Sequence, residues 1–151
     1  MIPAHEGTGN LPPGEHNASW AELWSRLGGS SRRECLLSGV QEVVIALQAA
    51  NVPRVYLNGS FVTAKEEPAD FDACWDYDDQ TNFDALEPLF WHPEFLAFPR
   101  LGQKARFGGE VFPAAALANE EGTTYRDFFQ RDKNSHQPKG IIVFDLRSEE
   151  L

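Results

Sequence analysis

Cysteine and long apolar runs are both scarce in this 151-residue sequence. Its two cysteines, Cys35 and Cys74, are too few to build a disulfide framework. No apolar run approaches the roughly 20 residues that cross a bilayer, and no charged-then-apolar start indicates a secretory signal. We therefore expect a cytoplasmic protein without a membrane-spanning segment.

Positive charge is also scarce, because 13 basic residues stand against 23 acidic ones and give a net charge of −10. Tight, non-specific binding of nucleic acid depends on neutralising phosphates, so this balance opposes it. The balance still permits a nucleotide held through metal ions, or RNA that touches one local basic patch. The sequence also lacks the GxxxxGK[ST] loop of P-loop kinases and ATPases, and any Ser-His-Asp or Cys/His metal spacing.

The length and the 42% apolar content predict one compact domain over residues 1–151. Residues 1–18 are rich in Pro, Gly and Asn and predict an extended N-terminal arm. Helices are expected at about 19–27, 32–50, 81–90 and 125–130, and strands at 55–57, 71–75, 110–114 and 140–146. The predicted fold class is α/β, with a small mixed sheet that carries helices packed on one face.

The most informative stretch contains Asp70 and Asp72, which are two residues apart in a predicted strand. Residues two apart in a strand point to the same face, so these carboxylates project together while Phe71 and Ala73 turn into the core. Paired carboxylates repel each other unless a cation neutralises them. A hard divalent ion such as Mg²⁺, which carboxylates share with substrate phosphates, meets that need.

Gly59 and Ser60 follow a short apolar run about ten residues before the carboxylates. A glycine lets backbone N–H groups approach phosphate oxygens, and a helix that begins there adds favourable partial charge. Asn58-Gly59 between two apolar triplets also predicts a β-hairpin, and propensity alone favours that alternative. The downstream carboxylates favour a unit of strand, turn and helix instead.

A Gly-Ser turn, an interval of this length and then Asp-x-Asp flanked by apolar residues resemble the core pattern of the nucleotidyltransferase superfamily. More narrowly, LNGSFVTAKEEPADFD is similar to a family of small, uncharacterised nucleotidyltransferase-like proteins with the pattern GSFVT-x-K-x-x-P-x-D-x-D. The resemblance extends to LPPGEH, KARFGGEVFPA and FFQRDKNSHQPKGI, and so covers most of the chain. It implies a minimal nucleotidyltransferase-like fold, in proteins that often belong to bacterial toxin–antitoxin or phage-defence modules.

On that resemblance, Asp70 and Asp72 bind Mg²⁺ or Mn²⁺, and a third carboxylate on a neighbouring strand completes a catalytic metal site. Glu110 is the expected third carboxylate, although its side chain is one methylene longer than that of Asp. Asp145, near the end of the last predicted strand, is a competing candidate.

The resemblance also implies that Gly59 and Ser60 hold the β- and γ-phosphates of a nucleotide. Lys65 is expected near those phosphates or, alternatively, as a solvated charge. Lys104 and Arg106 share a predicted bend and are candidates to contact triphosphate or RNA. A later basic group forms either a solvated loop or part of the same substrate patch: Arg131, Lys133 and Lys139.

The resulting expectation is a metal-dependent nucleotidyltransferase that moves a nucleoside monophosphate from an NTP onto an RNA, such as tRNA, or a protein acceptor. The alternative is a non-catalytic binding partner, for instance the antitoxin of a toxin–antitoxin pair.

The acidic stretch that begins at Asp76 has two other interpretations, neither of which involves nucleotidyl transfer. It resembles a calcium loop of EF-hand spacing, in which Thr81 stands where glycine is needed, or it is a solvated acidic loop.

Overall fold

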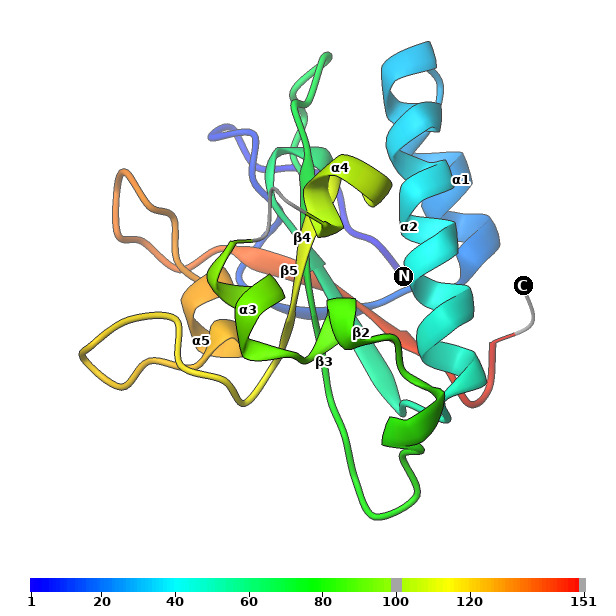
Figure 1. Ribbon diagram of the computed structural model, residues 1–151. Coiled ribbons are helices and arrows are strands. Elements are labelled where there is room, and N and C mark those ends of the chain that lie inside the picture. The colour runs from blue at the N-terminus through cyan, green and yellow to red at the C-terminus, as the bar shows by residue number, and fades with distance from the viewer. Residues whose placement is uncertain (99–101, 150–151) are drawn as a thin grey trace.

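Five strands form one mixed sheet in the computed structural model, which describes residues 1–98 and 102–149 (Figure 1). The strands are β1 (Gly14–Asn17), β2 (Arg54–Asn58), β3 (Phe71–Trp75), β4 (Gly109–Pro113) and β5 (Gly140–Asp145). Their order across the sheet is β1-β5-β2-β3-β4. The predicted small mixed sheet of an α/β fold is therefore confirmed.

The central strand β2 is antiparallel to both of its neighbours, β5 and β3. The two outer pairs are parallel, β1 with β5 and β4 with β3. Because parallel neighbours need a crossover, the chain between β3 and β4 is long. It contains η2 (Phe83–Ala85), η3 (Pro88–Phe90), α3 (Pro93–Ala97) and α4 (Gln103–Phe107). This arrangement brings the start of β3 beside the start of β4 and the end of β2.

One face of the sheet is covered by α1 (Trp20–Leu27), α2 (Ser31–Ala49) and α4, and Figure 1 shows α1 and α2 side by side. The opposite face carries α5 (Tyr125–Phe129), whose Phe129 packs with Tyr56 and Phe112 in a second apolar cluster. The expectation of helices on one face only is therefore corrected. Alternate residues of the central strands are apolar on both faces, so both faces need a cover.

Local sequence signals place the first two helices and divide the later segment. The Ser19 hydroxyl accepts a hydrogen bond from the N–H of Glu22 at 3.1 Å, and Ser30 caps α2 in the same way. The helix expected at about 81–90 is instead the pair of short 3-10 turns η2 and η3. Pro88 explains the difference, because it lacks the N–H that a continuous α-helix needs at that position.

The N-terminal arm is extended, as expected, and its last part adds the edge strand β1, which the sequence did not predict. Leu11 is buried in the core. Two polar contacts fix the arm to later segments: His5 Nε2 lies 2.9 Å from the carbonyl oxygen of Val62, and Asn10 Nδ2 donates to Asp132 at 3.0 Å. The arm therefore touches two segments that later prove to border the candidate site.

None of the helices within the described ranges combines the length and the apolar character needed to cross a bilayer.

Candidate functional site

Three polar residues form a row across neighbouring strands of the sheet. Asn58, the last residue of β2, is paired with Asp72 of β3, and Asp72 is paired in turn with Glu110 of β4. Cross-strand partners point to the same face of a sheet, so the three side chains project together. They face away from α2, because Phe71 and Ala73 on either side of Asp72 belong to the core beneath that helix. The structure thus places Glu110 on the strand beside Asp72, where the sequence analysis expected it.

Gly59 turns the chain directly after β2. Its φ of 86° and ψ of −176° lie in a region that only glycine adopts readily. An added Cβ would lie 3.0 Å from the amide nitrogen of Asp72 and 3.1 Å from its Oδ2. The turn leads into η1 (Ser60–Val62), and β3 begins only at Phe71, so the hairpin alternative is wrong. Since η1 is a single short 3-10 turn, it supplies no helix N-terminus of the expected kind.

A buried arginine of α2 holds the segment that follows the turn. The Arg33 side chain donates to backbone carbonyl oxygens of four residues: Leu27, Phe61, Thr63 and Lys65. Its guanidinium also lies over the Phe61 ring, 5.7 Å from the ring centroid. Among the described residues no carboxylate forms an ion pair with it, and burial lowers the pKa of this guanidinium. Carbonyl groups from two separate segments thus depend on a single cation.

A cavity of about 410 Å³ opens beside the Gly59 turn and the carboxylates. It is lined by most of the expected site residues: Gly59, Ser60, Lys65, Asp70 and Asp72. It is also lined by three cations of the late loop and its flank: Arg131, Lys133 and Lys139. The cavity thus gathers four of the 13 basic residues of the chain around three carboxylates, the third being Asp132.

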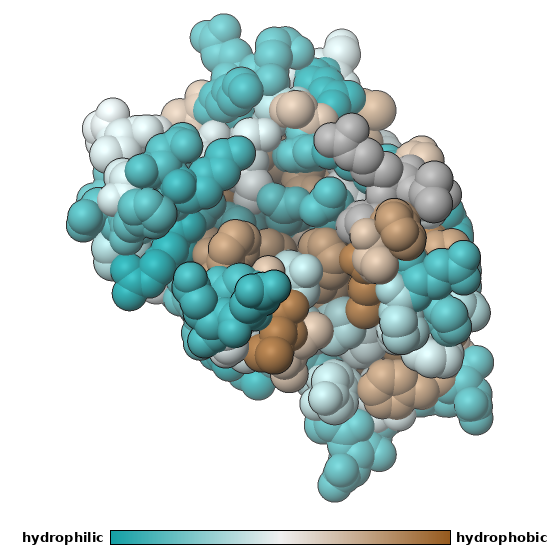
Figure 2. All heavy atoms as spheres, turned by 60° about the vertical axis from the view of Figure 1, so that its left-hand side comes forward, coloured by the Kyte–Doolittle hydropathy of each residue, from teal (hydrophilic) through white to brown (hydrophobic). Residues whose placement is uncertain are grey.

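The side of the molecule that carries α3 and α5 is brought forward in Figure 2. Hydrophobic residues lie there in a hollow between hydrophilic rims. Phe128 of α5 is 44% exposed, whereas Phe129 beside it is buried. Both residues line the cavity, so its wall combines charged and aromatic side chains.

Asp70 and Lys104 form an ion pair in which Nζ lies 2.8 Å from Oδ2. Lys104 belongs to α4, and the buried Gln103 fixes that helix to the sheet. The Gln103 amide donates to the carbonyl oxygens of Leu89 and Val111 and accepts from the N–H of Val111 at 2.8 Å. An ammonium group is therefore held against one of the two carboxylates.

Neither Lys104 nor Arg106 is among the described residues that line the cavity, and only Lys104 reaches its wall, through the ion pair with Asp70. The expectation that both contact a ligand there is corrected for Arg106. Its guanidinium pairs with Glu87 at 2.6 Å and with Glu42 at 3.7 Å, and it lies over the Phe107 ring. Side chains two positions apart on an α-helix point about 200° away from each other. Once Lys104 faces Asp70, Arg106 therefore has to face elsewhere.

Asp72 has the most perturbed environment of the expected carboxylates. Burial raises its pKa to about 6, and repulsion from Asp70 and Glu110 adds to the effect. Attraction to Lys139 and Lys104 offsets part of this rise in pKa. Burial in turn lowers the pKa of Lys139. A cation that approaches Asp72 would therefore offset the cost of its buried negative charge and reduce its repulsion from Asp70 and Glu110.

Mg²⁺ or Mn²⁺ fits the donors beside the cavity, although they are not gathered into a finished ligand set. Within residues 1–98 and 102–149, no three His, Cys, Asp or Glu side chains are arranged to hold a metal ion. Glu110 is not among the described residues that line the cavity. The wall nevertheless offers the carboxylates of Asp70 and Asp72 and the buried, unpartnered Oδ1 of Asn58. These are oxygen donors, the type that hard divalent cations prefer, and Lys104 already supplies positive charge there.

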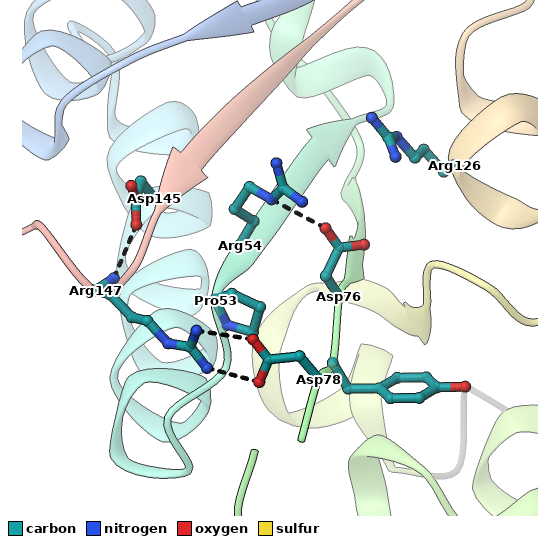
Figure 3. Close-up of a pocket in the computed structure, with 8 residues that line it drawn as sticks. Pro53, Arg54, Asp76, Asp78, Arg126, Asp145 and Arg147 are labelled. Atoms are coloured by element: carbon teal, nitrogen blue, oxygen red, sulfur yellow. Dashed lines mark hydrogen bonds and ion pairs between the residues drawn. The ribbon is translucent and has the colours of Figure 1, made fainter. Parts of the chain in front are cut away.

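A larger cavity of about 630 Å³ opens at the opposite end of β2 and β3 (Figure 3). Four of its charged residues are paired with one another: Arg54 with Asp76 at 3.1 Å, and Arg147 with Asp78 at 2.8 Å. Asp145 lies here, in register with Arg54, and so cannot join the carboxylate pair at the other end of the sheet. The calcium-loop alternative also weakens, because two of its ligands are held by arginines. We therefore place the candidate site at the smaller cavity.

Sequence reasoning missed three residues that shape the site. For Arg33 the sequence does contain a usable signal, because Arg33 lies four and seven residues before Leu37 and Val40, on the buried face of α2. Asn58 is a polar residue at the end of an otherwise apolar strand, a position that marks the edge of a site. Gln103 gave no local signal, because its partners belong to segments that only the fold brings together.

A family model described as a family of unknown function (DUF6932) matches residues 3–145. The chain belongs to this family. The match to DUF6932 runs from before β1 to the end of β5, so it includes every described residue that lines the candidate cavity. Neither a curated protein nor a solved structure matches the chain. The description of DUF6932 names no activity, so the resemblance to nucleotidyltransferases stays a prediction.

Replacing Arg33 with Met should lower the free energy of unfolding by about 3–5 kcal/mol, because several buried carbonyl groups lose their donor. Urea unfolding of the purified variant measures this change. The neighbouring Arg32→Met is the control, with a smaller expected loss because Arg32 donates to only two carbonyl groups, those of Pro68 and Ala69. An equal loss of unfolding free energy in the two variants would contradict the conclusion that Arg33 is the main residue holding the segment after Gly59.

Replacing Asp72 with Asn should change how stability depends on pH. The raised pKa of about 6 means that Asp72 contributes stability that is complete below about pH 4 and lost as the pH rises through about 6. Asn cannot ionise, so Asp72→Asn should be more stable than the parent by about 2 kcal/mol at neutral pH and equal to it near pH 4. Urea unfolding at several pH values, without divalent metal, measures the difference. Asp79→Asn, at an exposed site, should show no such pH-dependent gain.

Proposed function

We propose that this member of DUF6932 is a metal-dependent nucleotidyltransferase that moves a nucleoside monophosphate from an NTP onto an RNA or protein acceptor. One observation carries the proposal: a turn at Gly59, which has no side chain, lines the same cavity as the carboxylates of Asp70 and Asp72 and a set of cations. A polyphosphate needs such a combination, because its oxygens must approach backbone and cation closely while a divalent ion bridges them to carboxylates.

Asp70 and Asp72 are proposed to hold Mg²⁺ or Mn²⁺, which when bound neutralises phosphate charge and activates the attacking hydroxyl. Gly59 and Ser60 border the space that the phosphates would occupy. Lys139, which is partly buried, is the cation whose attraction lowers the pKa of Asp72 most. Glu110 stands next to Asp72 in register but outside the cavity wall. We therefore give Glu110 a positioning function, in which its negative charge increases the attraction of Asp72 for a cation.

The charge balance of the chain supports a substrate that brings its own metal. A triphosphate would meet strong repulsion from a molecule of net charge −10 unless local cations outweighed it. The late loop supplies such cations, and Arg131 and Lys133 lie at the cavity rather than on a remote surface. An RNA acceptor would meet the same cations.

A second candidate function is a non-catalytic binding partner that keeps the fold without the reaction. One observation favours it: the ion pair between Lys104 and Asp70 puts an ammonium group where a metal ion would otherwise be needed. In that case the cavity would stay closed to divalent metal, and the protein would act through its surface. The two candidates make opposite predictions for metal binding.

Under the first candidate, Mg²⁺ together with an NTP should raise the melting temperature by about 5 °C or more, and by more than Mg²⁺ alone. Phosphate oxygens would complete the coordination, which explains the difference. The double variant Asp70→Asn with Asp72→Asn should lose this increase. Thermal unfolding with and without each component measures it.

The matched control removes the same charge elsewhere, through Asp79→Asn with Asp84→Asn at exposed positions. This control should keep the full response to Mg²⁺ and NTP. A parent protein that shows no response, or a double site variant that keeps it, would favour the non-catalytic candidate.

Transfer of label from an NTP distinguishes catalysis from binding. With Mg²⁺ and an NTP labelled in its α-phosphate, label should appear in tRNA or in a protein of a cell lysate, and should be lost in Asp72→Asn. Electrophoresis of the products separates RNA from protein acceptors. A parent protein that binds NTP and metal but transfers no label to either class would show a binding module rather than a transferase.

A further inference from the structure

Asn58 has an unmet hydrogen-bonding capacity at the wall of the candidate cavity. The residue is only 5% exposed, and it lines the cavity at the end of β2. Its Oδ1 has no hydrogen-bond partner within the part of the chain that the structure describes. A buried polar atom without a partner costs roughly 1–3 kcal/mol, so such atoms mark places where a bound group completes them.

The position of Asn58 places its side chain beside that of Asp72. Asn58 and Asp72 are cross-strand partners, and the Cβ atoms of such partners are about 4.5–5.5 Å apart. The next residue, Gly59, has no side chain that could stand between them, and its backbone lies against the Asp72 carboxylate. Oδ1 of Asn58 and the carboxylate of Asp72 can therefore reach one bound atom from two sides.

The chemistry of these neighbours favours a cation as that bound atom. Asp70, Asp72 and the Asn58 carbonyl oxygen are all acceptors, so they have no proton to share among themselves at neutral pH. A hydrogen-bond donor would satisfy one of them, whereas a divalent cation satisfies several at once. Two carboxylates also balance a double positive charge, so a neutral third ligand leaves no surplus negative charge to repel a triphosphate.

We infer that Asn58, rather than Glu110, is the third protein ligand of the proposed metal site, bound through Oδ1. The inference rests on the proposed function, because it names the residue that completes the site of that function. Glu110 lies on the other side of Asp72 and does not line the cavity, so its carboxylate acts on Asp72 and not on the cation.

The test measures binding of Mn²⁺ alone to the full chain, by electron paramagnetic resonance of the free ion. It is done at about pH 8, above the pKa of about 6 of Asp72, so that this carboxylate is ionised. Asn58→Leu should weaken Mn²⁺ binding about tenfold or more, because one oxygen ligand is lost. Asn58→Asp should bind Mn²⁺ more tightly than the parent, because ligand charge increases affinity. Glu110→Gln should weaken binding less than Asn58→Leu does.

Unfolding in urea without metal separates ligation from a structural function. The Asn58 oxygen has no partner to lose, so Asn58→Leu should be as stable as the parent or more stable. If Asn58 instead donates its amide N–H to Asp72, Asn58→Leu would lose stability without metal and keep its affinity for Mn²⁺. That result overturns the inference.

The outcomes also separate this inference from the proposed function. Mn²⁺ binding that is lost in Asp72→Asn but stays within twofold of the parent in Asn58→Leu overturns the inference and leaves the function in place. A parent protein that binds no Mn²⁺ overturns both. Weakening in Asn58→Leu, tightening in Asn58→Asp and undiminished stability without metal together support the inference.

Discussion

The buried guanidinium of Arg33 is the interaction on which the geometry of the site depends. It donates from α2 to the carbonyl group of Leu27 at the end of α1 and to three carbonyl groups of the segment after the Gly59 turn. A loop of this kind would otherwise need water at each carbonyl group, and water would leave it mobile. One fixed, planar group with several donors replaces that water. The turn, the cavity and the start of β3 are positioned as a consequence.

Electrostatics determines what the cavity can hold. The carboxylates of Asp70 and Asp72 would repel each other strongly in isolation, and Glu110 adds to that repulsion. Lys104 and Lys139 reduce it, from α4 on one side and from the start of β5 on the other. Under the proposed function, the site is balanced between the observed ammonium group beside Asp70 and a divalent ion. Ligands that carry both phosphate and metal would shift that balance.

Rules that relate residues close in sequence predicted much of this structure. Strand alternation placed Asp70 and Asp72 beside each other, and the conformational freedom of glycine placed the turn at Gly59. Contacts of long range escaped these rules. The unexpected orientation of Arg106 follows from the way α4 is fixed to β4, and the burial of the Asn58 side chain follows from the pairing of β2 with β3. These contacts join segments that are far apart in the sequence, so no local pattern of residues predicts them.

The N-terminal arm makes the candidate site sensitive to events at the start of the chain. The ammonium group of Met1 donates to the carbonyl oxygen of Asn17, so the arm is held at its first residue. Along its course His5 contacts the segment after Gly59, and Asn10 contacts the late basic loop through Asp132. A change in the course of this arm would therefore reach both walls of the cavity. Proteolytic removal of the arm would take away its contacts with the same two walls.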